Sequence, residues 1–328
     1  MKIIVTGGSG FIGTNLIERL KIVPENKILN IDIKPPKLHS HINFWKDCDI
    51  LNSSLLSKII EEFRPEIVIH LAARTDTDPK CVLEDYKVNY VGTQNLIDGL
   101  ANINCLQRVV FTSTQFVNQY HGVPKDDEDF SPHTKYGESK VLMEQMIRKG
   151  NFSYTWTIIR PTNIWGPWHI RYPFEFWKVL SKGMYFHPGR KPVIRSYGYV
   201  GNVVWQIIKI LEADKKLINK QVFYVGDEPL DLYDWVNGFS NKQIGKNVKV
   251  IPRFVVQLMA FAGDLFATIG LKFPITSSRF KSMTNSNTAP MAKTFQVLGE
   301  APYSLDEGIT ETVNWLKKHH PDLIKISE

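Results

Sequence analysis

The sequence is poor in cysteine. Only Cys48, Cys81 and Cys105 occur in 328 residues, and they are scattered, which argues against a disulfide framework and a cysteine-based zinc site. The nine histidines are scattered too, with no His-x-x-x-His pair, so we predict no bound metal. This composition fits a reducing compartment. The opening MKIIVTGG has no cleavable hydrophobic region after a basic start, and we therefore expect a cytoplasmic protein.

Long hydrophobic runs are also lacking. The longest apolar stretch, 254–271, is interrupted by Gln257 and Asp264, and its length is at the short limit for a membrane span. We therefore expect a buried or amphipathic helix there. Contact of this stretch with a membrane surface is the less favoured alternative.

The charge balance is basic but diffuse. The net charge is +7, yet the chain has no basic tail and no array of basic and aromatic residues, so we expect no nucleic-acid binding. The excess of positive charge is compatible with an ordinary solvated surface or with attraction of an anionic ligand, such as a phosphate-bearing small molecule. Hydrophobic residues make up 43% and charged residues 22%, which is typical of a globular protein rather than a disordered chain.

What the sequence does contain is an alternation of strand and helix patterns over its first 165 residues. The strand patterns are continuous apolar runs, as in a parallel sheet that is covered on both faces. The pattern predicts an α/β fold with a doubly wound, Rossmann-type parallel sheet. The predicted strands are 2–7, 27–33, 66–72, 108–114 and 154–161, and the predicted helices are 11–20, 53–63, 83–102 and 135–150.

Beyond residue 165 the pattern is irregular, with one more strand at 221–227 and then mostly helices. The closing helix, 304–319, has Ser304 or Asp306 as its predicted N-cap. We expect a dinucleotide-binding domain from 1–165 plus about 197–227. A smaller, mostly helical substrate-binding lobe would comprise about 166–196 plus 228–328.

A glycine-rich turn links the first strand to the first helix. Gly7, Gly10 and Gly13 are spaced three apart in VTGGSGFIG, which allows the backbone to approach a pyrophosphate at a helix N-terminus. Asp32 ends the second strand, where a carboxylate can bind ribose hydroxyls and repel a 2′-phosphate, so NAD is favoured over NADP. Lys34 and Lys37 follow closely and leave NADP open.

Tyr136 and Lys140 lie four residues apart in TKYGESK, on one face of a predicted helix. Among 12 tyrosines this is the only Tyr-x-x-x-Lys pair, although roughly one such pair is expected by chance. Its context supports a role in proton transfer, because the strand with the sequence FTST precedes it and a cofactor turn lies in the same α/β unit. A Lys ammonium one helical turn away would favour the phenolate that a tyrosine base requires.

In these motifs the chain resembles an extended short-chain dehydrogenase/reductase of the NAD-dependent nucleotide-sugar epimerase/dehydratase type, similar to UDP-hexose 4-epimerases. The resemblance runs nearly end to end. It covers the glycine turn, Asp32, DCDI (47–50), HLAA (70–73), VNYVGTQNL (88–96), FTST (111–114), YGESK (136–140), RPTNIWGP (160–167), RSYGYVGNVV (195–204) and SRFKSMT (278–284).

The resemblance implies a role for each matching position. Thr114, Tyr136 and Lys140 would be catalytic. The cofactor would contact Gly7, Gly10, Phe11, Ile12, Gly13, Asp32, Asp49, Ile50, Leu71, Ala72, Ala73, Asn89, Thr112, Tyr136, Lys140 and Pro161. The substrate would contact Arg74, Thr114, Gln115, Asn163, Arg195 and Arg279, with Arg171 and Arg190 in the same lobe. The resemblance also implies a homodimer that packs the helices at 83–102 and 135–150.

Two departures from the family pattern concern the substrate. The loop TQFVNQYHG (114–122) replaces the usual Val-Tyr-Gly, and Arg195-Ser196 replaces Arg-Asp. Gln115 and Phe116 follow Thr114 where sugar dehydratases carry Asp-Glu, and neither can act as a general acid or base, so dehydration is disfavoured.

The leading hypothesis is NAD-dependent epimerisation of a nucleotide sugar at C4, in carbohydrate metabolism or polysaccharide biosynthesis. The substrate would be a UDP-hexose or UDP-N-acetylhexosamine, oxidised transiently to a keto sugar with Tyr136 as the base. The alternative is an NAD(P)-dependent dehydrogenase or ketoreductase of a nucleotide sugar, or of a hydrophobic alcohol of the 3β-hydroxysteroid type. A non-catalytic dinucleotide sensor is a third reading, which the presence of Thr114, Tyr136 and Lys140 disfavours.

Overall fold

A computed structural model of the chain describes residues 1–118, 124–169, 173–268, 270, 271, 273 and 275–323. The chain divides into two compact units. The first comprises Met1–Ile164, Gly198–Asp227 and Ala289–Pro302, and the second comprises Trp165–Tyr197, Glu228–Thr288 and Tyr303–Glu328.

The first unit is built on a seven-stranded sheet with the order β11-β6-β5-β4-β1-β2-β3. All its neighbouring strands run parallel, which confirms the predicted doubly wound α/β fold. The strands are β1 (Lys2–Thr6), β2 (Lys27–Asp32), β3 (Trp45–Asp47), β4 (Ile67–His70), β5 (Arg108–Thr112), β6 (Thr155–Pro161) and β11 (Gln221–Val225).

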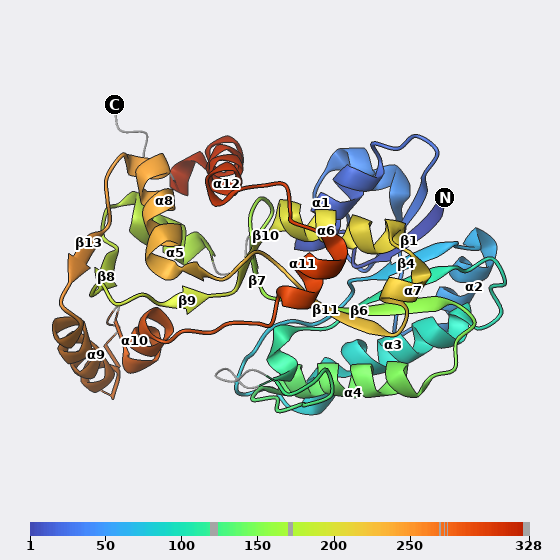
Figure 1. The fold of residues 1–328 in the computed structure, drawn as a ribbon, viewed down its shortest axis with the longest axis horizontal. Coiled ribbons are helices and arrows are strands. Elements are labelled where there is room, and N and C mark those ends of the chain that lie inside the picture. The colour runs from blue at the N-terminus through green and yellow to red at the C-terminus, as the bar shows by residue number, and fades with distance from the viewer. Residues whose placement is uncertain (119–123, 170–172, 269, 272, 274, 324–328) are drawn as a thin grey trace. The chain divides into compact units, whose positions relative to one another are not determined.

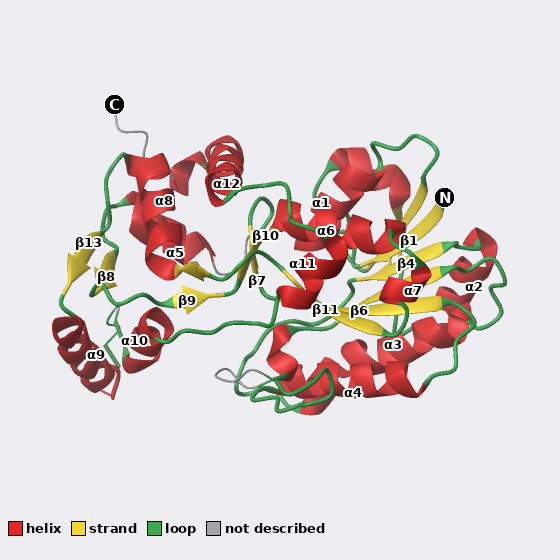
Figure 2. Cartoon of the chain, viewed as in Figure 1, coloured by secondary structure: helices red, strands yellow, loops and turns green. Residues whose placement is uncertain are grey.

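Helices cover both faces of this sheet. Figures 1 and 2 show α2, α3 and α4 along one face, and α1 and α6 along the other. The helices are α1 (Phe11–Leu20), α2 (Ser53–Phe63), α3 (Lys87–Leu100), α4 (Lys135–Lys149), α6 (Val200–Glu212), α7 (Lys215–Ile218) and α11 (Ala292–Leu298), with 3-10 turns η1 (His39–Phe44), η2 (Leu83–Tyr86) and η3 (Gln115–Val117).

Over the first 165 residues, two elements differ clearly between prediction and structure, and helix α6 beyond them was not predicted. The helix predicted at 83–102 is divided into η2 and α3. The edge strand β3 was not predicted, because its three residues pair only with β2 and only Trp45 among them is partly buried. A strand this short carries no apolar alternation that the sequence could show.

The second unit is mostly helical. Its helices are α5 (Pro173–Ser181), α8 (Leu232–Ile244), α9 (Arg253–Thr268), α10 (Ser277–Thr284), α12 (Leu305–His319) and the turn η4 (Pro321–Leu323). Two pairs of short strands complete it: β8 (Phe186–Pro188) with β13 (Lys249–Ile251), and β9 (Ile194–Arg195) with β12 (Leu230–Asp231). Strands β7 (Asn163–Trp165) and β10 (Tyr197–Tyr199) lie where the chain passes between the units. Ser304 is the N-cap of α12, in a capping box with Glu307.

Aromatic rings form the core of the second unit. Trp165, at 4% exposure, and Trp177, at 3%, are buried, and their ring centroids lie 5.4 Å and 4.5 Å from that of Phe239 on α8. The aromatic-rich stretch 165–177 therefore supplies core rings. These two indoles are not free to line a pocket for a hydrophobic substrate.

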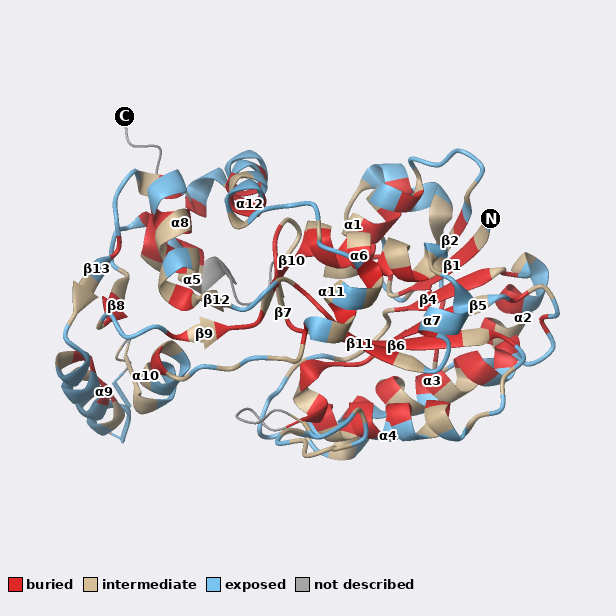
Figure 3. Cartoon of the chain, viewed as in Figure 1, coloured by how far each residue is buried: buried red, intermediate tan, exposed pale blue. Residues whose placement is uncertain are grey.

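Helix α9 forms within the stretch predicted as a buried or amphipathic helix. It buries only Val256, Ala260 and Gly263, and Figure 3 shows much of its surface as exposed. Among the residues that the structure describes, none of the helices combines the length and apolar character that crossing a membrane requires.

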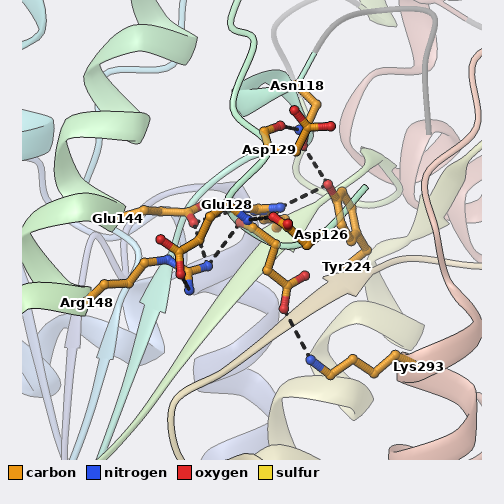
Figure 4. A network of polar contacts seen from close by, with 10 residues as sticks. Asn118, Asp126, Glu128, Asp129, Glu144, Arg148, Tyr224 and Lys293 are labelled. Atoms are coloured by element: carbon orange, nitrogen blue, oxygen red, sulfur yellow. Dashed lines mark hydrogen bonds and ion pairs between the residues drawn. The ribbon is translucent and has the colours of Figure 1, made fainter. Parts of the chain in front are cut away.

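A buried ion pair joins α4 to β6 in the first unit, and Figure 4 shows Glu144, Tyr224 and Lys293 of the surrounding polar network. Arg160 on β6 and Glu144 on α4 are both fully buried, with Nη2 and Oε2 2.8 Å apart. The Arg160 guanidinium also donates to the Asp127 carbonyl at 2.6 Å and to the Tyr224 hydroxyl at 3.1 Å. Lys293 on α11 pairs with the Asp127 carboxylate at 3.3 Å. The network thereby fixes the acidic segment before α4 against β6 and β11.

Removing one partner of this pair should be costly. We expect Arg160→Met to lower the free energy of unfolding by about 3–5 kcal/mol, because the buried Glu144 would lose its close partner and keep only Arg148, whose Nη2 lies 3.6 Å away. Lys209→Gln, which breaks an exposed pair with Glu212, is the matched control and should cost less than about 1 kcal/mol. Urea unfolding measures both, and equal losses in the two variants would contradict this account.

Candidate active site

Two positions of the glycine turn, Gly7 and Gly13, have room only for a residue without a side chain. Gly7 has a φ of +73°, and a Cβ there would lie 2.6 Å from the backbone nitrogen of Ala72. A Cβ on Gly13 would lie 2.5 Å from the Gly7 carbonyl oxygen. Gly10 is the N-cap of α1, and its N–H donates to the Gly7 carbonyl at 3.0 Å. The turn is thus a backbone cradle at a helix N-terminus, which suits a dinucleotide pyrophosphate.

Asp32 is tied to this cradle. Its carboxylate accepts a hydrogen bond from the Ser9 N–H at 3.1 Å and another from the Lys34 N–H at 2.9 Å. Burial raises the pKa of Asp32 despite these hydrogen bonds. Each carboxylate oxygen can still accept another bond, so Asp32 remains able to bind ribose hydroxyls.

Gly8 and Asn30 also shape the cradle, and neither was predicted as a site residue. A Cβ on Gly8 would lie 2.4 Å from the Asn30 side-chain oxygen, and the Asn30 amide donates to the Ser9 hydroxyl at 3.0 Å. One indication of this contact is present in the sequence, the glycine that directly follows Gly7. The need for glycine at position 8 becomes clear only from the contact with Asn30, which lies on β2.

The other predicted cofactor residues of this unit lie around the carboxyl edge of the sheet. Ile50 is buried and stands against Gly92 of α3, where a Cβ would lie 2.6 Å from the Ile50 Cδ1. The Leu71 N–H donates to the Thr6 carbonyl at 3.0 Å and so continues β4 beyond its last residue. Phe11 and Ile12 begin α1, Asp49 follows β3, Ala72 and Ala73 follow β4, and Pro161 ends β6.

The catalytic candidates come together where α4 begins and β5 ends. Thr134 caps α4 by accepting a hydrogen bond from the Gly137 N–H at 3.0 Å. Tyr136 is 6% exposed, and its ring centroid lies 6.4 Å from that of Phe116. Lys140, one turn later, is 1% exposed and donates from Nζ to the Thr112 carbonyl at 2.8 Å. Thr112 and Lys140 therefore lock the helix to the strand.

Thr114 and Gln115 follow β5 and are also buried. The Thr114 hydroxyl accepts a hydrogen bond from the Phe116 N–H at 3.2 Å and caps η3. The rest of the altered loop, residues 119–123, lies outside the described residues, as does Arg171.

Burial changes the acid–base properties of Lys140. It lowers the pKa of Lys140 from 10.5 to about 7, although the charge of Glu144 acts in the opposite direction. The ammonium is thus easily deprotonated near neutral pH, and any negative charge that forms close by would stabilise it.

A chain of hydrogen bonds runs from the cradle to α3. The Thr6 hydroxyl accepts from the Ala72 N–H at 3.3 Å and lies 2.7 Å from Nδ1 of His70. Nε2 of His70 lies 2.9 Å from the Thr93 hydroxyl, which donates to the Asn89 carbonyl at 2.7 Å. Burial, followed by the charge of Lys140, lowers the pKa of His70 to about 3. The imidazole is therefore neutral, and these partners assign its proton to Nε2.

Asn89 continues this chain of hydrogen bonds to α4. Its side-chain oxygen accepts from the Arg74 N–H at 2.8 Å, and its amide donates to the Ser139 hydroxyl at 2.9 Å. Ser139 in turn donates to the carbonyl of Tyr136 at 2.7 Å. His70, Thr93 and Ser139 were not predicted as site residues, because only their tertiary partners reveal their role.

The predicted substrate residues have different surroundings. The Arg74 guanidinium is paired with Asp76 at 2.8 Å and lies 5.0 Å from the Tyr86 ring centroid. The hydrogen bond from Arg74, opposed by some burial, lowers the pKa of Asp76 to about 2. Arg74 therefore already has a carboxylate partner. Asn163 lies on β7.

Arg195 and Arg279 belong to the second unit. Arg195 is 3% exposed and donates to the Ser282 carbonyl of α10 at 2.6 Å, while Arg279 is exposed on the same helix. Arg190 is exposed in the segment between β8 and β9. Within the described ranges, no three His, Cys, Asp or Glu side chains come together in a way that could hold a metal ion.

Comparison with known proteins identifies similar chains. The sequence profile of the NAD dependent epimerase/dehydratase family matches residues 3–226. A 4-epimerase of N-acetyl-alpha-D-glucosaminyl-diphospho-ditrans,octacis-undecaprenol from Escherichia coli O157:H7 is 25% identical and covers 99% of both chains. A 3 beta-hydroxysteroid dehydrogenase/Delta 5-->4-isomerase from Monkeypox virus is 26% identical over 96% of this chain and 98% of its own.

A solved structure has the same fold. The UDP-glucuronic acid 4-epimerase from Bacillus cereus, in complex with UDP-glucuronic acid and NAD, superposes with a TM-score of 0.72 at 22% identity. The match covers 97% of this chain and 99% of that one.

The cradle geometry makes a direct prediction. We expect Gly13→Ala to weaken NAD binding by at least about tenfold and to lower the free energy of unfolding of the free protein by about 1–3 kcal/mol, because its Cβ would overlap backbone. Gly10→Ala is the matched control for folding, since its Cβ would have only the Gly7 oxygen nearby, at 3.0 Å. Calorimetric titration with NAD and thermal unfolding without it test the two effects. An unchanged unfolding temperature for Gly13→Ala would refute the close packing.

The low pKa of Lys140 predicts how stability depends on pH. Between about pH 7 and 10 the unfolded chain keeps a lysine proton that the folded chain has released, so raising the pH favours folding by up to about 1.4 kcal/mol per pH unit. Lys140→Met should remove this rise and stabilise the cofactor-free protein near pH 7. Lys135→Met, at an exposed position of the same helix, should retain it. Urea unfolding across this range gives the slopes, and parallel curves for Lys140→Met and the natural protein would count against a buried cation.

Proposed function

Because the chain belongs to the NAD-dependent epimerase/dehydratase family, whose cofactor is NAD, we propose that it epimerises a nucleotide sugar at C4. The substrate would be a UDP-hexose or UDP-N-acetylhexosamine. The observation that carries this proposal is the buried Lys140, held by the Thr112 carbonyl one helical turn after Tyr136. This arrangement provides a proton-transfer group at the edge of the sheet where open α/β folds bind ligands.

The cofactor site and the reacting groups lie at the same edge. The cradle of Gly7, Gly10 and Gly13 would hold the pyrophosphate, and Asp32 would hold the adenosine ribose. Bound NAD would supply the redox chemistry at the sugar carbon. Tyr136 would remove the proton from the 4-hydroxyl while that carbon is oxidised to a ketone, and would return the proton after the keto sugar has turned over. Thr114 would orient the same sugar oxygen through its hydroxyl.

Lys140 makes a tyrosine usable as a base. A tyrosine has an ordinary pKa of about 10 and is mostly protonated at neutral pH. An ammonium one turn away stabilises the phenolate, and the phenolate in turn favours the charged form of Lys140. Because burial lowers the pKa of Lys140 to about 7, a phenolate close by would help Lys140 to keep its charge.

The surroundings of Thr114 support epimerisation over dehydration. Elimination of water from a keto sugar requires a general acid and a general base beside the ring. Gln115 and Phe116 occupy the two positions after Thr114, and neither side chain exchanges protons. The catalytic set is thus limited to moving one proton to and from a hydroxyl.

A second candidate is oxidation of a hydroxyl on a lipid. The Escherichia coli relative is named for a sugar that a diphosphate joins to undecaprenol, and the viral relative for a 3β-hydroxysteroid, and each matches nearly the whole chain. The same three groups suffice to dehydrogenate such an alcohol. Trp165 and Trp177 do not support binding of such a hydrophobic substrate, because both rings pack against Phe239 in the core of the second unit.

Two further features belong to the proposal. Arg195 and Arg279 would pair with the substrate diphosphate. The protein would form a homodimer through α3 and α4, where Val91 and Leu142 are large apolar residues that are each 39% exposed.

Product analysis distinguishes the candidates. The purified protein is incubated in parallel with UDP-glucose, UDP-N-acetylglucosamine, N-acetylglucosaminyl-diphospho-undecaprenol and a 3β-hydroxysteroid, with added NAD. Conversion of a UDP-sugar to its 4-epimer without net NADH supports the proposal. Stoichiometric NADH with any substrate would replace it with a dehydrogenase, and epimerisation confined to the lipid-linked sugar would change the substrate class.

The role of Tyr136 has its own test. We expect Tyr136→Phe to reduce kcat by about 10²–10⁴, because only the proton-transfer group is lost, with NAD affinity unchanged. Tyr90→Phe, which removes a hydroxyl bonded to Glu84 on the surface, should retain normal activity. Steady-state rates and NAD titration give both quantities. Activity within a factor of two of normal in Tyr136→Phe would eliminate the proposed base.

A further inference from the structure

The exposed side of α9 carries a continuous apolar stripe. Phe254, Leu258, Phe261 and Leu265 are 65%, 64%, 61% and 67% exposed, and we call these four the α9 stripe. Their spacing of four, three and four residues aligns them on one side of the helix. A solvated surface helix carries polar residues on that side, so the α9 stripe is a surface that a partner should cover.

Packing on the opposite side prevents the helix from turning the α9 stripe inward. The inner side presents Val256, Ala260 and Gly263. A Cβ on Gly263 would lie only 1.9 Å from the Ile275 carbonyl oxygen, so only glycine fits there. Asp264 also accepts a hydrogen bond from the Ser277 N–H at 3.1 Å. The rotation of α9 is therefore fixed, and the exposure of the stripe is a built-in property of the second unit.

Basic residues flank the α9 stripe in the sequence. From 246 to 281 the sequence has six Lys and Arg and a single acidic residue, Asp264. Five of these cations are exposed in the structure: Lys246, Lys249, Arg253, Arg279 and Lys281. The second unit has 16 Lys and Arg against 10 Asp and Glu, whereas the first has 24 against 23. The excess positive charge of the chain is thus concentrated in the unit that bears the stripe.

We propose that the α9 stripe inserts into the surface of an anionic lipid bilayer, with α9 parallel to the membrane plane. An exposed apolar face flanked by Lys and Arg is the pattern of helices that lie at a membrane interface, where apolar burial and attraction to anionic headgroups add. A second copy of the chain is a poorer occupant, because a two-fold contact places the same patch on both sides and opposes its cations. This inference does not depend on the proposed catalytic function.

Vesicle sedimentation tests the proposal with the full chain. We expect the protein to co-sediment with vesicles of phosphatidylcholine and phosphatidylglycerol, and to bind pure phosphatidylcholine vesicles at least about tenfold more weakly, with the difference falling at high salt. The double variant Leu258→Ser/Phe261→Ser should bind the anionic vesicles at least about tenfold more weakly. Lys249→Gln/Lys281→Gln should reduce the preference for anionic over neutral vesicles.

A matched control distinguishes binding through the α9 stripe from non-specific binding by any exposed apolar side chain. Ile22→Ser/Leu217→Ser removes two apolar side chains of the first unit that are 61% and 53% exposed, and it should bind vesicles like the natural protein. Circular dichroism and thermal unfolding should match among all variants, since every substituted side chain is largely in solvent. Failure of the natural protein to bind anionic vesicles would overturn the proposal, as would equal binding by the stripe variant and the control. A dimer that the stripe variant converts to monomer, without vesicle binding, would assign the stripe to a second copy instead.

Discussion

The carboxyl edge of the sheet depends on one backbone contact, the approach of Gly7 to Ala72. The two segments lie so close that a single carbon on Gly7 would overlap the backbone of Leu71 and Ala72, just after β4. This approach brings the Ala72 N–H to Thr6, from which the polar chain through His70 and Thr93 reaches α3. The glycine cradle and the hydrogen-bonded scaffold of α4 therefore depend on the same contact. Under the proposed function, a wider spacing at this point would separate the cofactor from Tyr136 and Lys140.

Helix α4 carries the proposed catalytic groups and its anchors to the sheet on the same buried side. Tyr136, Lys140 and Glu144 follow one another at four-residue intervals, and all three are buried. Glu144 binds Arg160 on β6, Lys140 binds the end of β5, and Tyr136 stands at the edge of the sheet. A helix that only had to pack would place apolar residues at these positions. The free energy lost by burying Lys140 is offset by the ion pair one turn later and by Met143 and Ile147 in the core.

The sequence predicted the features that short-range patterns encode. The strands and helices around the cradle came from apolar periodicity, and the three spaced glycines marked the turn because each requirement is local. Gly8, His70 and Ser139 escaped prediction because their partners lie far away in the sequence, on β2 for Gly8 and on α3 for His70 and Ser139. Arg74 was expected to meet substrate, and only the structure shows Asp76 beside it. The apolar stretch 254–271 was expected to pack inward or be amphipathic, and periodicity could not reveal that its outer side is apolar as well.

Neither unit is a continuous piece of the chain. The first unit receives its last segment, Ala289–Pro302, after most of the second has been synthesised. That segment is integral to the first unit, because Thr294 bonds the Tyr224 carbonyl of β11 and Lys293 reaches Asp127. On the ribosome, the first unit therefore cannot be completed until nearly the whole protein has emerged. A premature stop anywhere before residue 289 leaves both units unfinished, so partial products of this gene should be handed to proteolysis rather than survive as a cofactor-binding fragment.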